Sequence, residues 1–143
     1  MNKKGFTLIE LLVVIAIIGL LSTLAVVALS SARTKARDSK RLSDLKQVQT
    51  ALELYFTDNN GYPTASVTLG ATSAACLNTS GFSTLGCSNP YMGNVPADPR
   101  SGSYSYVSTA STSYRITATL EGTMSGMSGT IYATQNGIST TST

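Results

Sequence analysis

The chain has 143 residues, with 10 basic and 7 acidic side chains, a formal charge of +3 and no histidine. Beyond an apolar N-terminal run, it is long enough for one small domain and too short for a multidomain machine. Its acids are scattered and no base accompanies a nucleophile, so the sequence predicts a protein without catalytic chemistry of its own.

Residues 6–29 form an apolar run that contains a single charged side chain, Glu10. At about 1.5 Å per residue, a helix of this length exceeds the ~30 Å hydrocarbon thickness of a bilayer. The run is also longer than the apolar region of a secretory signal peptide. We therefore predict a retained membrane-spanning helix over residues 6–32. An ionised group in hydrocarbon costs about 2.5 to 3.5 kcal/mol, so Glu10 needs a partner or a path to the headgroups.

From Phe6 to about Asn59 the chain has no proline and one glycine, which predicts one continuous helix. Its second half, about residues 33–60, is amphipathic. The Asn59–Asn60–Gly61 stretch and Pro63 predict where the helix ends. The predicted buried face consists of large apolar residues at three- and four-residue spacing: Leu42, Leu45, Val48, Leu52, Tyr55 and Phe56.

Beyond this helix the composition changes, because 30 of the last 83 residues are Ser or Thr. We predict a loop over residues 61–102 and a β-sheet over 103–138, with strands at 104–107, 114–120 and 131–133. The glycine-rich stretch from 122 to 129 is predicted to be a loop. The fold class is therefore α+β, with a long N-terminal helix packed against a small antiparallel sheet.

Six basic residues follow the apolar run, interrupted by two aspartates. Helical spacing predicts that Asp38 pairs with Arg41 and that Lys40 pairs with Asp44, or that the basic residues contact other subunits or anionic headgroups. Arginines on a helix also suit DNA phosphates, but no aromatic side chains are interleaved here, so nucleic acid is not the expected partner. The basic residues are Arg33, Lys35, Arg37, Lys40, Arg41 and Lys46.

The chain has two cysteines, Cys76 and Cys87, on either side of a Ser/Thr/Gly-rich stretch. A pair that closes a short loop in an exported domain is typical of a disulfide. Two free thiols, or half of a metal site, is the alternative, although the chain has no histidine or third cysteine to complete such a site.

The N-terminal string Lys-Lys-Gly-Phe-Thr-Leu-Ile-Glu at residues 3–10 resembles the prepilin signal of type IV pilins and type II secretion pseudopilins. Residues 55–63 are similar to the helix end of the major pseudopilins, and residues 96–106 resemble the segment that follows it. The loop at 65–94 and the last twenty residues carry no such resemblance.

This resemblance implies that residues 1–5 are a leader. A prepilin peptidase would cut between Gly5 and Phe6 on the cytoplasmic side and methylate the new amine of Phe6. Glu10 lies four residues after Phe6, so its carboxylate could pair with the Phe6 amine of a neighbouring subunit. The alternative for Glu10 is to reach the headgroups without a partner.

The resemblance further implies an exported domain over residues 33–143 and a subunit that leaves the inner membrane for an extracellular filament. The expected partners are other copies of the chain, the prepilin peptidase, an inner-membrane assembly platform and, before assembly, the membrane itself. The N-terminus is expected in the cytoplasm, although six basic residues on the exported side run against the positive-inside rule.

Major pseudopilins hold calcium near the end of the sheet with several oxygen ligands that include aspartates. Here the only acid after Asp98 is Glu121, whereas calcium takes six to eight oxygens. We therefore expect no cofactor and favour a type IV pilus-like structural subunit. The alternatives are a major pseudopilin of a type II secretion system, a low-abundance adhesin or DNA-binding minor pilin, and an uncleaved membrane-anchored domain.

Overall fold

The computed structural model describes residues 5–141, and these divide into two compact units between Thr34 and Lys35. Residues 1–4 of the predicted leader and residues 142–143 of the predicted exported domain lie outside the described part. One helix, α1 at Leu8–Asn59, contributes to both units. The first unit consists of the start of α1 and the residues before it, and the second contains the rest of α1 and all of the β-structure.

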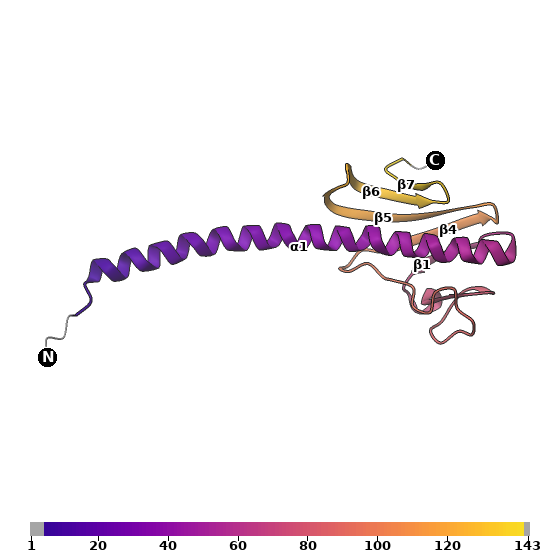
Figure 1. The fold of residues 1–143 in the computed structure, drawn as a ribbon, viewed down its shortest axis with the longest axis horizontal. Helices are drawn as coiled ribbons and strands as arrows, with labels where there is room; N and C mark the ends of the chain where they lie inside the picture. Colours follow the sequence, from indigo (N-terminus) through magenta and orange to yellow (C-terminus); the bar gives the residue numbers. More distant parts are fainter. Residues whose placement is uncertain (1–4, 142–143) are drawn as a thin grey trace. The chain divides into compact units, whose positions relative to one another are not determined.

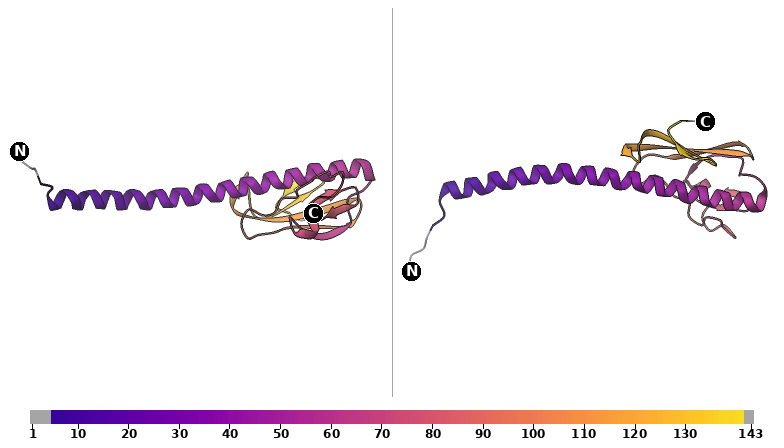
Figure 2. Two further views of the ribbon diagram at one scale, coloured as in Figure 1. Left: turned by 90° about the horizontal axis from the view of Figure 1, so that it is seen from below. Right: turned by 45° about the horizontal axis from the view of Figure 1, so that its top comes forward.

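The second unit contains a five-stranded antiparallel sheet in the order β1-β4-β5-β6-β7 and a separate two-stranded hairpin, β2-β3. The sheet lies alongside the C-terminal half of α1 (Figures 1 and 2). The strands are β1 Ala65–Leu69, β2 Cys76–Asn78, β3 Gly81–Ser83, β4 Tyr104–Ala110, β5 Ser113–Met124, β6 Met127–Thr134 and β7 Gly137–Ser139, with a 3-10 helix, η1, at Thr72–Ala74.

The core lies between one face of this sheet and one face of α1. Leu45, Val48 and Leu52 are fully or almost fully buried, as their helical spacing predicts. The other predicted residues of this face, Leu42, Tyr55 and Phe56, are partly buried against the same cluster. On the sheet side the core consists of the alternate residues of the central strands: Tyr104, Tyr106, Tyr114, Ile116, Ala118, Leu120, Ile131 and Ala133.

The predicted end of α1 is confirmed, since Asn60 adopts a left-handed backbone with φ 53° and its N–H bonds to the carbonyl of Phe56 at 2.8 Å. The predicted start at Phe6 differs by two residues. The helix begins at Leu8 because the preceding Thr7 uses its side chain to cap the first turn.

The predicted loop over residues 61–102 is wrong in part, because it contains β1, β2 and β3. Strand β1 pairs along its whole length with β4, and β2 pairs residue by residue with β3. These strands have only five or three residues, too few for a clear alternation of apolar and polar side chains. Their hydrogen-bond partners lie elsewhere in the chain, so the local pattern is not decisive.

The predicted loop over residues 122–129 is also wrong. Strand β5 continues to Met124 and β6 begins at Met127. The two residues between them, Ser125 and Gly126, both have positive φ, 53° and 77°, as in the tight two-residue turns of β-hairpins. The glycines and serines here therefore form a hairpin turn, and the sheet extends well beyond the predicted bounds of 114–120 and 131–133.

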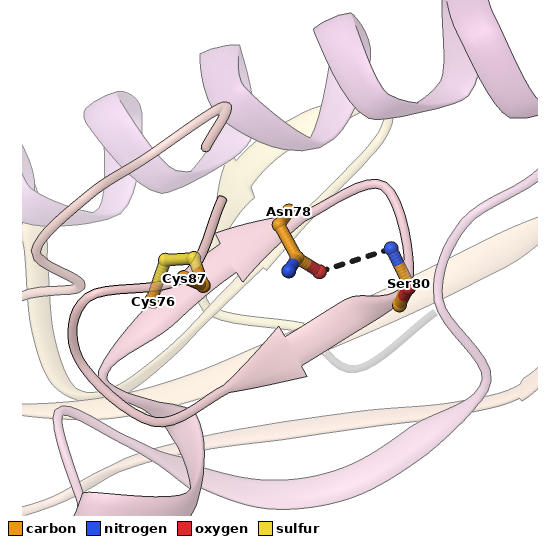
Figure 3. Close-up of a disulfide and its surroundings, with 4 residues drawn as sticks. All are labelled: Cys76, Asn78, Ser80 and Cys87. Atoms are coloured by element: carbon orange, nitrogen blue, oxygen red, sulfur yellow. Dashed lines mark hydrogen bonds between the residues drawn. A yellow bond between two sulfur atoms is a disulfide. The ribbon is translucent and has the colours of Figure 1, made fainter. Parts of the chain in front are cut away.

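The disulfide between Cys76 and Cys87 is formed and closes a loop with a sequence separation of 11 (Figure 3). Cys76 opens β2, and the β2-β3 turn is held by a hydrogen bond of 2.9 Å from the Ser80 backbone to the Asn78 side chain. The backbone of Leu77 in β2 also pairs with Met92 beyond the loop. These bonds give a defined structure to a polar segment that has little apolar surface of its own.

Candidate functional site

The start of α1 is built as a capping box around Thr7 and Glu10. The Thr7 backbone N–H and hydroxyl donate to Glu10 Oε2 at 2.8 and 2.7 Å. In return the Glu10 backbone N–H donates to the Thr7 hydroxyl oxygen at 3.3 Å. This reciprocal arrangement satisfies donors that the first helical turn would leave without partners. Within a single chain, the Glu10 carboxylate thus has a partner in its own helix cap.

The residues around this cap are exposed. Phe6 is 87% exposed, and Gly5 has no atom within 4 Å of the position of an added Cβ. The backbone around the predicted cleavage bond is therefore open to another protein. The cleavage at Gly5–Phe6, the methylation of Phe6 and the pairing of Phe6 with Glu10 stay predictions.

The apolar part of α1 is exposed throughout, including Leu11, Ile15 and Leu24. An 18-residue window of this helix has a mean hydropathy of 2.9 and is 0% buried, and α1 is the single helix among residues 5–141 that is long and apolar enough to cross a membrane. Apolar surface of this extent is covered by lipid or by other helices in a working protein.

A buried ionic cluster in the second unit is centred on Arg41, whose side chain is 3% exposed. Its guanidinium donates to Asp38 at 2.7 Å, to Asp98 at 2.7 and 3.0 Å and to Glu121 at 2.8 Å. The carboxylates come from the helix, from the segment before β4 and from β5. A buried guanidinium needs such a set of acceptors, because an unpaired charge in the interior is very costly.

Asp38 also accepts hydrogen bonds from the part of β5 that extends beyond its pairing with β4. The register between β5 and β6 shifts between Thr119 and Thr123, and β4 pairs with β5 only as far along as Thr117. The backbone N–H groups of Glu121 and Gly122 donate to the two oxygens of Asp38 at 2.9 and 2.8 Å. The helix carboxylate thus supplies the acceptors that a neighbouring strand would otherwise provide.

Two further arginines, Arg37 and Arg100, donate hydrogen bonds to the Glu121 carboxylate. Arg37 donates to both of its oxygens at 2.7 and 2.6 Å, and Arg100 adds a contact at 3.0 Å. Hydrogen bonds from Arg37 and Arg41 lower the pKa of Glu121 to about 2. The pKa of Asp98 is also lowered, first by Arg41 and then by the backbone N–H of Arg100. Both carboxylates are held in the charged form.

A second acid of the helix, Asp44, accepts from Lys40 at 3.1 Å and from the buried Tyr104 hydroxyl at 3.1 Å. Burial, together with the Asp44 charge, raises the pKa of Tyr104. The predicted pairs Asp38–Arg41 and Lys40–Asp44 are both present. Arg41 points into the protein and is not free for a nucleic acid phosphate.

The contacts of Arg41 with Asp98 and Glu121 were not predicted, because each joins residues at least 57 positions apart. One signal was available, since these are the only two acids after residue 61 and both lie in segments otherwise poor in charge. Between residues 5 and 141 no group of three or more His, Cys, Asp or Glu side chains is arranged to hold a metal ion.

Residues 1–26 match the prokaryotic N-terminal methylation motif, and residues 28–132 match the family model described as type II secretion system (T2SS), protein G. The second match covers most of the second unit, from α1 through most of β6, and begins within α1 at residue 28. No solved structure matches the chain.

Some individual relatives are named as type II secretion proteins, and another is named as a type IV pilus component. The type II secretion system core protein G of Aeromonas hydrophila is 43% identical over 70 residues, 49% of each chain, so the match spans about half of that relative. The protein of the same name from Klebsiella michiganensis is 35% identical over 109 residues, 75% of each chain. The type IV wide pilus major component PilA4 of Thermus thermophilus is 46% identical over 61 residues, 43% of this chain and 47% of its own.

Proposed function

We propose that this chain, which belongs to the type II secretion system protein G family, is a structural subunit of a type IV pilus-like extracellular filament. The subunit waits in the inner membrane as a prepilin and polymerises through the apolar part of α1. It has no catalytic chemistry of its own, and it takes no cofactor.

The observation that carries this proposal is the apolar, exposed helix that begins with a capped glutamate. Glu10 lies in the first turn of α1, and the residues after it expose large apolar side chains to the surroundings. A helical bundle of such segments buries this surface in the core of a filament. Carboxylates in that setting are costly without a cation, and a charged amine is available at Phe6 once the leader is removed.

The processing steps follow from this arrangement. A prepilin peptidase cuts between Gly5 and Phe6 on the cytoplasmic side of the membrane and methylates the Phe6 amine. The match of residues 1–26 to the N-terminal methylation motif supports both steps. Glu10 then exchanges its contact with Thr7 for the Phe6 amine of a neighbouring subunit, which fixes the register as the inner-membrane assembly platform adds subunits.

The Arg41 cluster supports a pilus-like subunit over a major pseudopilin that holds calcium with aspartates. The two acids that follow residue 61, Asp98 and Glu121, are both held by arginines. The exported domain thus joins its helix, its sheet and the segment before β4 by arginine contacts within the chain. We infer that this domain keeps its structure outside the cell without a bound cation.

Substitution of Glu10 tests the assembly mechanism. Glu10→Gln and Glu10→Ala should leave the precursor cleavable, with a mature chain that begins at Phe6 by N-terminal sequencing, yet filaments should be absent from cells by electron microscopy. Thr23→Val is a matched control in the same apolar segment, since the Thr23 hydroxyl bonds only to the carbonyl of Leu20 in its own helix at 2.8 Å. Normal filaments from either Glu10 variant would exclude the pairing mechanism.

A second candidate is a major pseudopilin of a type II secretion system, the kind of system for which two of the relatives above are named. The two functions differ in what a deletion strain loses. A pilus subunit is required for long surface filaments, whereas a pseudopilin is required for release of exported enzymes. Loss of secretion without loss of filaments would favour the second candidate.

A further inference from the structure

The face of the sheet that points away from α1 carries a row of hydroxyl groups. In an antiparallel sheet, directly opposite residues point to the same side. The row takes one residue from each of the five strands, and every member has a hydroxyl: Thr68, Ser105, Thr117, Tyr132 and Ser139. Their neighbours along the strands, such as Tyr106 and Ile116, are buried in the core.

The residues beside this row extend the same surface. Ser66, Val107 and Arg115 form a second row across β1, β4 and β5, and Thr119 lies opposite Thr130. We call these residues and the first row the outer sheet face. Apart from Val107 and Arg115, every residue of the outer sheet face carries a hydroxyl, and none carries a carboxylate.

One aromatic ring and one cation stand within this face. The Arg115 guanidinium lies over the Tyr132 ring, 5.9 Å from its centroid. This contact holds the planar groups together. Tyr132 is only partly buried, and Arg115 beside it is exposed. Because Arg115 lies over one face of the ring, the stacked pair as a whole, a planar guanidinium against an aromatic ring, is what this face presents, with hydrogen-bond donors at its edge.

A hollow of about 430 Å³ adjoins the face where β4 and β5 turn. Its walls include Val107 and Arg115 from the outer sheet face, together with Gln135 and Asn136 from the β6-β7 turn. The carboxamides of Gln135 and Asn136 each offer donors and an acceptor. The hollow therefore continues the polar surface beyond the edge of the hydroxyl row.

The chemistry of this surface selects among ligands. A protein partner of ordinary affinity needs an apolar centre, and the outer sheet face offers little beyond Val107 and the Tyr132 ring. A nucleic acid needs several cations for its phosphates, and this face has Arg115 alone. A neutral sugar has the matching chemistry, because its ring presents C–H groups for an aromatic ring and hydroxyls that donate and accept.

We propose that the outer sheet face binds a neutral polysaccharide. Sugar rings lie against the stacked Tyr132–Arg115 pair, and their hydroxyls bond to the threonine and serine rows and to the carboxamides of the hollow. The face suits an extended polymer because the hydroxyl row crosses all five strands. A single subunit binds the polysaccharide weakly. A filament repeats the outer sheet face many times, so many subunits bind one polymer together with high avidity. Only this avidity rests on the proposed function.

The test uses the full chain solubilised in mild detergent, with microcrystalline cellulose and chitin as the two probes in a sedimentation assay. Binding to at least one probe is expected, and Tyr132→Thr should weaken it about tenfold, which corresponds to ~1.4 kcal/mol. This variant keeps a strand-forming residue and a hydroxyl but removes the ring. Thr117→Val, which removes one hydroxyl at nearly constant shape, should weaken binding less.

Two matched controls lie off this face. Tyr91→Thr removes a tyrosine that packs on Tyr55, and Lys46→Ala removes an exposed cation of α1. Both should bind as the wild type does, whereas Arg115→Ala should bind more weakly. Equal loss in Tyr91→Thr and Tyr132→Thr, or no sedimentation of the wild type with either probe, would overturn the proposal.

A second copy of the chain is the competing occupant. If Tyr132→Thr reduces self-association in sedimentation velocity and leaves polysaccharide binding unchanged, the face is a subunit contact and the proposal is wrong. The binding assay uses unassembled subunits, so it does not depend on filaments. Binding with no filaments on cells would contradict the proposed function alone, and filaments without binding would contradict this inference alone.

Discussion

Asp38 Oδ2 lies 2.8 Å from the backbone nitrogen of Gly122, although 84 residues separate them in the chain. The contact lets a helix side chain act as the hydrogen-bond partner of a strand edge. The same carboxylate contacts Arg41 at 2.7 Å, and Arg41 reaches Asp98 before β4. Asp38 therefore connects the helix, the sheet and the preceding segment at one buried point.

Removal of the Asp38 carboxylate should strongly destabilise the exported domain. Asp38→Ala leaves two strand N–H groups without their acceptor and removes one of three anions around Arg41, so we expect a loss of about 3 kcal/mol. The free energy of unfolding can be measured by urea titration in mild detergent, followed by the near-ultraviolet circular dichroism of the tyrosines. The exposed neighbour Ser39 is the control, and Ser39→Ala should change stability by less than ~0.5 kcal/mol.

Acid should destabilise the exported domain in a defined range of pH. The ordinary pKa of Glu121 is 4.5 and its folded pKa is about 2, so the unfolded chain binds the proton first as the pH falls. The stabilisation from this group is complete above about pH 4.5 and is lost progressively down to about pH 2. Asp98 adds in the same direction, because its pKa is also lowered.

Thermal unfolding at a series of pH values measures this dependence. Glu121→Gln is the informative control, since it cannot lose a charge and should show a shallower decline over the same range. A variant with the same pH profile as the wild type would contradict the assignment to Glu121.

Loss of the disulfide should destabilise the domain by about 3 kcal/mol on the chain-entropy account of a short closed loop. The sequence separation of Cys76 and Cys87 is 11, and the residues between them form β2, β3 and two turns. The double variant Cys76→Ala/Cys87→Ala tests this by its unfolding midpoint. Reduction of the wild type should lower the midpoint by a similar amount and should leave the double variant unchanged.

Two glycines with nearly the same positive φ should tolerate alanine very differently. Gly70 has φ 75° and Gly126 has φ 77°, but an added Cβ at Gly70 would lie 2.5 Å from the Cβ of Ala97, whereas nothing lies within 4 Å at Gly126. Both substitutions incur left-handed strain of about 1 to 2 kcal/mol. Gly70→Ala should cost about 1 to 3 kcal/mol more through overpacking.

Unfolding titrations of the two glycine variants, run side by side, isolate this packing effect. Equal losses would show that the segment around Ala97 moves aside without cost.

The prediction from sequence succeeded where the information is local. The end of α1 at Asn59, the buried face through Leu45 and Leu52, and the pairs Asp38–Arg41 and Lys40–Asp44 depend on residues within a few positions of each other. The predicted strands at 104–107 and 114–120 lie within β4 and β5, where Tyr104, Tyr106 and Tyr114 are buried. In each case a helix or strand period is enough to place the side chain.

It failed where pairing with a distant segment decides the conformation. Strand β1 forms because β4 offers it a complete register, and β5 runs to Met124 because β6 returns along it. The glycine and serine content of residues 122–129 is compatible with either a loop or a hairpin. Only the presence of the partner strand distinguishes the two.

The sequence by itself determined the family resemblance, the long helix, the apolar segment with its single acid and the α+β class, because these depend on composition, short motifs and helical period. The tertiary structure alone decided that Arg41 gathers Asp98 and Glu121, and that one hydroxyl from each strand aligns across the outer sheet face. Both need residues far apart in the chain to meet. Such contacts depend on register and packing, which no local pattern encodes.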